Sequence, residues 1–222
     1  MPLRKFTVQD VLLEVEQAML NEPLVAALES GRYEGAESKA LKALLRADDH
    51  YFELGGGLGF VSTLACRIVT DPARVHVYEA NPELLPVIER NWAINGVSAS
   101  VYNCMLGKGL GEHEFHVSKA FWASSGHISY GGGRTIKVPQ RDFLKQLGKK
   151  EATFVMMDIE GGEKDLLDKV LPPRVRAVVA EYHPRIIGEE VVSALWRHLE
   201  SQGFRVVPEV SDNKVRAYVR GK

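Results

Sequence analysis

The chain has 222 residues, of which 28 are Lys or Arg and 29 are Asp or Glu, so its net charge is -1. This balance argues against a nucleic-acid binder, which needs a basic face, and no run approaches the roughly 20 apolar residues that span a bilayer. The two cysteines are too few for a disulfide scaffold or a structural zinc site. We therefore expect a cytoplasmic protein that has no membrane partner and for which nucleic acid is not the favoured partner.

Apolar residues at helical spacing predict that residues 8–46 are helical. Val11, Leu12 and Val15 carry the first part of this pattern, and Leu41 and Leu44 carry the second. We assign residues 1–46 to an N-terminal helical appendage and residues 47–222 to a separate α/β domain.

From His50 onward, short apolar runs alternate with helical stretches. The predicted strands are 50–54, 74–79, 99–104, 153–158, 175–181, 204–210 and 214–220, and the predicted helices are 59–70, 84–95, 162–169 and 189–202. Strand, helix and strand in succession favour a parallel sheet with helices on both faces. The turn residues 211–213 make the last two strands an antiparallel hairpin. The sequence thus predicts a Rossmann-like, seven-stranded, mostly parallel sheet with N-terminal helices.

A glycine-rich loop follows the first predicted strand, with Glu53, Gly55, Gly57 and Gly59 spaced two residues apart. The spacing matches neither the Gly-x-Gly-x-x-Gly dinucleotide motif nor a phosphate-binding P-loop. It resembles motif I of the class I S-adenosylmethionine-dependent methyltransferases. The resemblance implies that these four residues bind S-adenosylmethionine; a glycine-rich turn without a ligand is the alternative.

The next two strands end in polar groups that suit a nucleoside. Glu79, followed by Ala80, can accept hydrogen bonds from both ribose hydroxyls. Asn103 and the backbone of Cys104 can pair with the adenine, although an ordinary strand-end Asn explains Asn103 equally well.

The fourth strand of the domain leads into Asp158-Ile159-Glu160-Gly161-Gly162-Glu163. This run resembles the signature of the FkbM-type methyltransferases, as do Glu79-Ala80-Asn81-Pro82 and Ala180-Glu181-Tyr182-His183. The resemblance covers roughly residues 33–206. It implies O-methylation of a hydroxyl on a small molecule, sugar or natural product, with S-adenosylmethionine as cofactor. We assign Asp158 to cofactor binding.

A hydroxyl acceptor must lose its proton, and a general base can contribute about 10²–10⁴-fold to the rate. The candidates are His183, Glu160 and Glu181, with Asp158 beside them. His183 has the most suitable ordinary pKa, and an extended backbone puts Glu181 and His183 on the same side. Three carboxylates also suit a divalent metal, but they do not establish one. Glu163 is expected to be a helix first-turn acid.

Several questions stay open at this level. An RNA or protein methyltransferase and a catalytically inactive nucleotide-binding domain are the alternative functions, and a homodimer is compatible with the sequence. The glycine-rich segment 107–141, with Phe121, Trp122 and Tyr130, is expected to cover the substrate. Glu34 and Glu37 are either surface acids or close over the methionine end of the cofactor.

Overall fold

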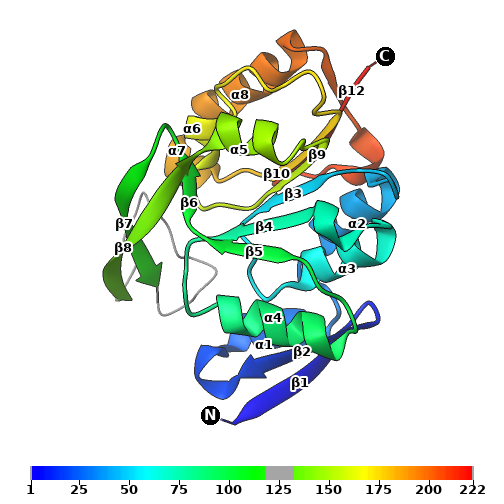
Figure 1. Ribbon diagram of the computed structural model, residues 1–222, viewed down its shortest axis with the longest axis vertical. Coiled ribbons are helices and arrows are strands. Elements are labelled where there is room, and N and C mark those ends of the chain that lie inside the picture. The colour runs from blue at the N-terminus through cyan, green and yellow to red at the C-terminus, as the bar shows by residue number, and fades with distance from the viewer. Residues whose placement is uncertain (1, 119–132, 222) are drawn as a thin grey trace.

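A seven-stranded sheet forms the centre of the computed structural model, which describes residues 2–118 and 133–221 (Figure 1). Its strands are β3 (Tyr51–Leu54), β4 (Val75–Glu79), β5 (Ser100–Asn103), β9 (Phe154–Met157), β10 (Ala177–Glu181), β11 (Phe204–Val206) and β12 (Val215–Arg220). Their order is β11-β12-β10-β9-β3-β4-β5. β10, β9, β3, β4 and β5 run parallel, whereas β12 pairs antiparallel with both β10 and β11. The expected mostly parallel sheet with a C-terminal antiparallel hairpin is confirmed.

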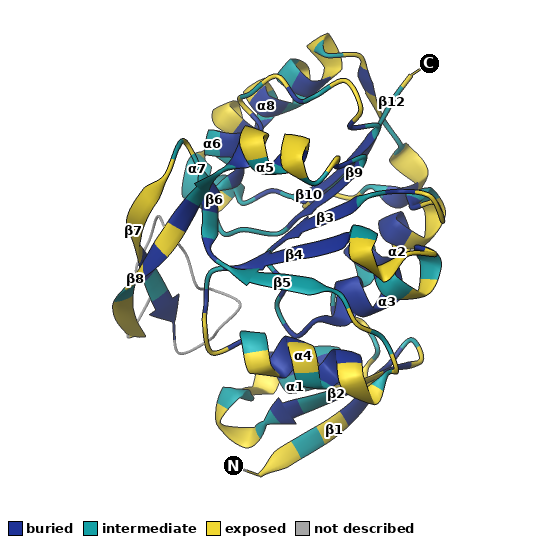
Figure 2. Ribbon diagram, in the orientation of Figure 1, coloured by how far each residue is buried: buried dark blue, intermediate teal, exposed yellow. Residues whose placement is uncertain are grey.

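Helices cover both faces of this sheet. The described helices are α1 (Glu22–Glu29), α2 (Gly35–Leu44), α3 (Phe60–Ile68), α4 (Leu85–Ile94), α5 (Phe143–Lys149), α6 (Glu163–Leu166), α7 (Pro184–Ile187) and α8 (Glu189–Ser201), with 3-10 turns at Gln17–Met19, Pro72–Arg74 and Pro208–Val210. Side chains of β3 alternate between two hydrophobic clusters: Tyr51 packs with α1 to α4, and Phe52 packs with α5, α6 and α8. The central strands are therefore buried on both faces, as Figure 2 shows.

The first 16 residues differ from the sequence prediction. They form an antiparallel hairpin of β1 (Leu3–Val8) and β2 (Val11–Glu16) rather than the start of a helix. Val11, Leu13 and Val15 are buried while Leu12 is 47 % exposed, which is the two-residue period of a strand. The turn at Gln9 and Asp10 has positive φ at both residues, which is typical of a tight hairpin turn. The predicted helices within 22–46 are present, and the domain boundary at residue 46 stays a prediction.

Asn91 of α4 and Asn95, which caps the C-terminus of this helix, fasten the hairpin to α4. Asn91 accepts a hydrogen bond from the Glu14 amide, and Asn95 bonds to both the amide and the carbonyl of Leu12. Asn91 also donates to the carbonyl of Leu58 in the glycine-rich loop, at 2.9 Å. The helix thus joins the N-terminal hairpin to the loop that follows β3.

A second, three-stranded sheet lies beside the carboxyl ends of the central strands. It contains β6 (Met105–Gly107), β7 (Gly111–Ser118) and β8 (Gly133–Asp142), in the order β6-β8-β7. β7 and β8 form an antiparallel pair within the glycine-rich segment 107–141. Among the helices in the described part of the chain, none has the length and apolar character to span a membrane.

Candidate functional site

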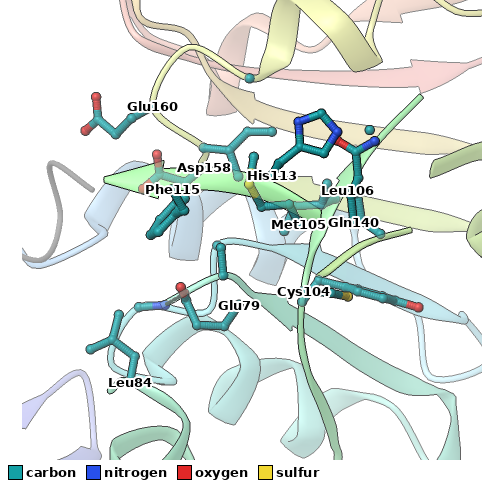
Figure 3. Close-up of a pocket in the computed structure, with 18 of the residues that line it drawn as sticks. Glu79, Leu84, Cys104, Met105, Leu106, His113, Phe115, Gln140, Asp158 and Glu160 are labelled. Carbon is teal, nitrogen blue, oxygen red and sulfur yellow. Dashed lines mark hydrogen bonds between the residues drawn. The ribbon is translucent and has the colours of Figure 1, made fainter. Parts of the chain in front are cut away.

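A cavity of about 340 Å³ lies where the carboxyl ends of β3, β4 and β9 meet the small sheet. Ligands of open α/β folds bind at this edge of the sheet, and the volume is within the range of small-molecule pockets. Figure 3 shows ten labelled lining residues; Glu79 and Leu84 lie on one side, and Asp158 and Glu160 on the other. The residues that line the cavity include Tyr33, Glu34, Gly55, Gly57, Tyr78, Glu79, Ala80, Leu84, Cys104, His113, Phe115, Gln140, Asp158 and Glu160.

The glycine-rich loop forms the floor of this cavity at Gly55 and Gly57. A Cβ atom on Gly55, at φ +85°, would lie only 1.9 Å from the backbone oxygen of Asp158. A Cβ on Gly57, at φ +52°, would lie 3.2 Å from both Glu34 Oε1 and the Tyr33 hydroxyl. The two glycines therefore let the main chain pass close to β9 and leave its surface open to a ligand. Gly59 begins α3 and packs against Ile88 and Trp92, behind the cavity.

Glu79 lies at the end of β4 with its side chain in the cavity wall. Its Oε1 accepts a hydrogen bond from the Asn81 amide at 2.7 Å, and its Oε2 accepts one from the Gly57 amide at 3.2 Å. Burial raises the pKa of this carboxyl, and these backbone amides oppose the rise. A carboxylate has further lone pairs, so Glu79 can still accept hydrogen bonds from two vicinal hydroxyls.

The other predicted cofactor residues divide into two groups. Ala80 and Cys104 line the cavity, as expected. Glu53 does not belong to the lining; it is 2 % exposed and accepts a hydrogen bond from the Tyr51 hydroxyl at 2.8 Å. Burial raises its pKa well above the ordinary range. Asn103 also lies outside the lining, and its amide donates to the carbonyls of Glu79 and Ala80, each at 3.0 Å. Asn103 thus holds the end of β4, and the hydrogen bond of Glu53 lies within β3.

His183 follows β10 and is held by Glu163, which the sequence suggested was only a helix first-turn acid. One oxygen of Glu163 accepts from the His183 amide at 2.8 Å and lies 3.0 Å from its Nδ1. Because a carboxylate only accepts, Nδ1 carries the proton. The opposite nitrogen, Nε2, lies 3.8 Å from Asp158 Oδ1 and 3.5 Å from Glu160 Oε2.

The charges around His183 set its pKa. Burial alone would lower the pKa, but the hydrogen bond to Glu163 and the charges of Glu160, Glu163 and Glu181 outweigh burial, and the net shift is upward. At neutral pH the ring therefore holds its proton more firmly than an ordinary histidine does.

Carboxyl groups gather on the same side of the cavity. Glu34 and Glu37 belong to the turn and helix α2, and Glu37 is 7 % exposed. Burial, followed by smaller contributions that include the charge of Glu181, raises the pKa of Glu34 to about 8 and that of Glu37 to about 7. Burial and the charges of Glu181, Glu37, Glu34 and Glu160 also raise the pKa of Asp158 well above its ordinary range. These acids are thus part of the site rather than of a solvated surface.

Glu160 and Glu181, the other predicted catalytic residues, take different places. Glu160 lines the cavity, whereas Glu181 lies behind Asp158 with Lys214 Nζ at 3.8 Å. Asp158, Glu181 and His183 each offer one ligand atom, and these atoms lie within 4.8 Å of one another. The site therefore contains the Glu160 carboxylate in the cavity lining and a candidate cation-binding group formed by Asp158, Glu181 and His183. Phe121, Trp122 and Tyr130 lie outside the described residues.

The residues that line the cavity fit S-adenosylmethionine. The open backbone at Gly55 and Gly57 leaves room for the methionine portion, and the carboxyl groups of Glu34 and Asp158 line the same cavity and can accept hydrogen bonds from an ammonium group. Glu79 suits the ribose hydroxyls. Leu54, Tyr78, Leu84, Cys104 and Leu106 provide apolar wall for a purine ring.

Comparison with solved structures shows the same fold at low sequence identity. TYW2 of M. jannaschii, solved in complex with AdoMet, has a TM-score of 0.51 and 13% identity, and the match covers 98% of this chain and 84% of that one. The M. jannaschii tRNA m1G37 methyltransferase has a TM-score of 0.52 and 12% identity, covering 99% of this chain and 57% of that one. A dimethyladenosine transferase from Plasmodium falciparum has a TM-score of 0.50 and 12% identity, covering 85% and 62%.

The sequence comparisons decide the family. No curated protein sequence matches the chain. The family profile described as the Methyltransferase FkbM domain matches residues 59–206, which is more than half of the chain and includes α3, Glu79, the Asp158 run and His183. The expected Rossmann-like methyltransferase fold and the expected cofactor are thereby confirmed. The chain belongs to the FkbM methyltransferase domain family, and it is an S-adenosylmethionine-dependent methyltransferase.

Proposed function

We propose that the protein transfers the methyl group to a hydroxyl oxygen of a small polar or sugar-containing molecule. The observation that carries this proposal is the position of Glu160, which lines the same cavity as Gly55, Gly57 and Glu79. A carboxylate at that place can receive the proton of a hydroxyl that lies next to the cofactor site.

The cofactor supplies an electrophilic methyl carbon on a sulfonium. The fold supports its binding through backbone at Gly55 and Gly57, through Glu79 for the ribose hydroxyls, and through Glu34 for the cationic end. Glu53, Gly59 and Asn103 lie outside the cavity lining, and Asn103 holds the end of β4. Holding the two reactants in line can contribute about 7–11 kcal/mol to catalysis.

Glu160 is a better candidate for the base than His183, which we favoured from the sequence. The charges around His183 raise its pKa, which makes the ring a weaker candidate for an unprotonated base, and His183 lies outside the cavity lining, 3.5 Å from Glu160. Burial is the main reason that the pKa of Glu160 is raised, and the charges of Glu181 and Glu163 add to it. A carboxylate with a raised pKa is a stronger proton acceptor near neutral pH.

The small sheet supports a role in holding the acceptor. His113 and Phe115 of β7 and Gln140 of β8 line the cavity opposite the loop, as Figure 3 shows. They offer one aromatic face and two hydrogen-bonding side chains, which suits a polar molecule with some apolar surface.

A panel of small hydroxyl compounds and glycosides, incubated with the protein and methyl-labelled cofactor, tests the proposal. For any acceptor found, Glu160→Gln is expected to lower kcat by about 10²–10⁴-fold. The affinity for S-adenosylhomocysteine, measured by calorimetry, should stay unchanged. Glu114→Gln is the control, because it removes the same charge from another residue that lines the cavity.

Three results would contradict the proposal. An undiminished kcat for Glu160→Gln would remove this residue from the reaction. Labelled methyl appearing in RNA or protein but in none of the small molecules would favour the alternative acceptors. Cofactor binding without any turnover would favour an inactive binding domain.

A further inference from the structure

Three side chains at the edge of the cavity meet at the ends of two neighbouring strands. Asp158 follows β9, Glu181 ends β10, and His183 lies two residues further on. β9 and β10 are parallel neighbours, so their carboxyl ends reach the same edge of the sheet. One ligand atom from each of the three residues lies within 4.8 Å of the other two. Two carboxylate oxygens and one imidazole nitrogen are thereby gathered around a single point.

Glu163 holds the His183 imidazole in the tautomer that suits a metal ligand. Its side chain is fully buried, and one of its oxygens accepts from both the backbone amide and Nδ1 of His183. The proton on Nδ1 leaves Nε2 as the nitrogen that faces Asp158, 3.8 Å from Oδ1. Histidines that bind metals almost always donate their other ring N–H to such a second group.

Glu37 provides a second and independent indication that a cation is needed. Its side chain is 7 % exposed on α2, which packs against β10, and it repels the charges of Glu181 and Asp158. Within residues 2–118 and 133–221, its carboxyl accepts a hydrogen bond only from its own backbone amide. Lys214 is 3.8 Å from Glu181 but three-quarters exposed, so it compensates these charges weakly. Buried charges are paired or coordinate metals.

We propose that Asp158, Glu181 and His183 bind a divalent cation, whose charge would also offset the repulsion between Glu37 and the two ligating carboxylates. One imidazole nitrogen and two carboxylate oxygens suit a first-row transition metal such as Mn²⁺ better than Mg²⁺ or Ca²⁺. Asp158 also lines the cavity, so a cation held there has open positions toward the acceptor and can polarise an acceptor oxygen. The proposed site does not depend on which acceptor the protein methylates.

Titration of Mn²⁺ into the full chain, stripped beforehand with a chelator, tests the site. Loss of the electron paramagnetic resonance signal of free Mn²⁺ should report one bound ion per chain. His183→Ala and Glu181→Gln are each expected to weaken Mn²⁺ binding at least about tenfold. Glu114→Gln should bind Mn²⁺ as the wild type does, because this acid lines the cavity on β7 and is not part of the cluster.

Asp158→Asn serves as a third variant that keeps the shape of the side chain, and thermal unfolding shows which variants fold. Mn²⁺ should raise the Tm of the wild type and of Glu114→Gln, but not that of the folded cluster variants. The proposal is overturned if the wild type leaves the Mn²⁺ signal unchanged, or if the cluster variants bind as tightly as the wild type. Binding of S-adenosylhomocysteine and methyl transfer with chelator present report separately on the function proposed above.

Discussion

The carboxylates on the two sides of the cavity have different surroundings: those on one side accept hydrogen bonds, and those on the other repel one another. On the glycine-loop side, Glu79 accepts from the Gly57 and Asn81 amides, and Glu53 accepts from the Tyr51 hydroxyl. On the acidic side, Glu37, Asp158 and Glu181 repel one another. The loop side thus pairs its carboxylates with groups of the chain itself, whereas the acidic side keeps charges that repel one another and that a bound cation would offset. This difference favours the acidic side as the half that responds to a ligand.

The largest effect is expected from Gly55→Val, a substitution in the glycine-rich loop. A Cβ would lie 1.9 Å from the Asp158 oxygen, at a φ of +85° that β-branched residues avoid. We expect loss of measurable S-adenosylhomocysteine binding in calorimetry, together with a lower Tm. Gly148→Ala is the control, since nothing lies near its Cβ position in α5, and it should stabilise the helix by up to about 1 kcal/mol. Retained binding in Gly55→Val would show that the loop can rearrange.

Glu79→Gln comes next and removes the acceptor of two backbone amides. The glutamine has one accepting oxygen, and its NH₂ group would face an amide that also donates. Hydrogen bonds to charged groups contribute about 1.5–3 kcal/mol, so we expect S-adenosylhomocysteine to bind about 10–100-fold more weakly. The exposed Glu83, whose partner is Arg134, gives the matched Glu83→Gln control. Equal affinities in the two variants would mean that Glu79 does not contact the ligand.

Glu163→Ala removes the carboxylate that holds His183 in place. It leaves the amide and Nδ1 of His183 without their acceptor, and one unsatisfied buried group costs about 1–3 kcal/mol. Urea unfolding should show a loss of that size and partial rescue by Glu163→Gln. Glu190→Ala removes an exposed first-turn acid of α8 and should cost less. If the two alanine variants lose the same free energy, Glu163 is only a first-turn acid.

Glu37→Gln should have the smallest effect and the opposite sign. The pKa of Glu37 is raised to about 7 in the folded chain, so between its ordinary range and pH 7 the folded state keeps a proton that the unfolded chain has lost. Stability therefore falls as the pH rises through this window. With chelator present, Glu37→Gln should raise the Tm at pH 8 by about 2–4 °C or more, and by less at pH 5. The exposed Glu89→Gln should show no such dependence on pH; a lower Tm for Glu37→Gln at pH 8 would contradict the repulsion.

The sequence predicted the glycine-loop side because its information is local. The glycine spacing after β3 and the acid that ends β4 are each contained in a few consecutive residues. The N-terminal hairpin was missed because Val11, Leu12 and Val15 satisfy a helical pattern, and the turn at Gln9 and Asp10 contains no glycine. Only tertiary packing shows that Leu12 is the exposed member.

The acidic side could not be predicted in the same way, because four separate segments build it. Residues 33–37, 158–163, 181–183 and Lys214 come together only when α2, β9 and β10 pack. No spacing in the sequence links Glu163 to His183, and nothing local distinguishes the buried Glu37 from a solvated acid. The sequence supplied the correct residue types at the strand ends, but not their partners.

Asn91 gives the N-terminal hairpin an influence beyond its own packing. The same side chain accepts a hydrogen bond from the Glu14 amide and donates one to the Leu58 carbonyl. One side-chain amide therefore connects the β1–β2 hairpin to the glycine-rich loop. Local unfolding of the β1–β2 hairpin would remove the hydrogen bond between the Asn91 side chain and the Glu14 amide. Fraying of the hairpin is therefore expected to weaken cofactor binding, although no residue of β1 or β2 is among those that line the cavity.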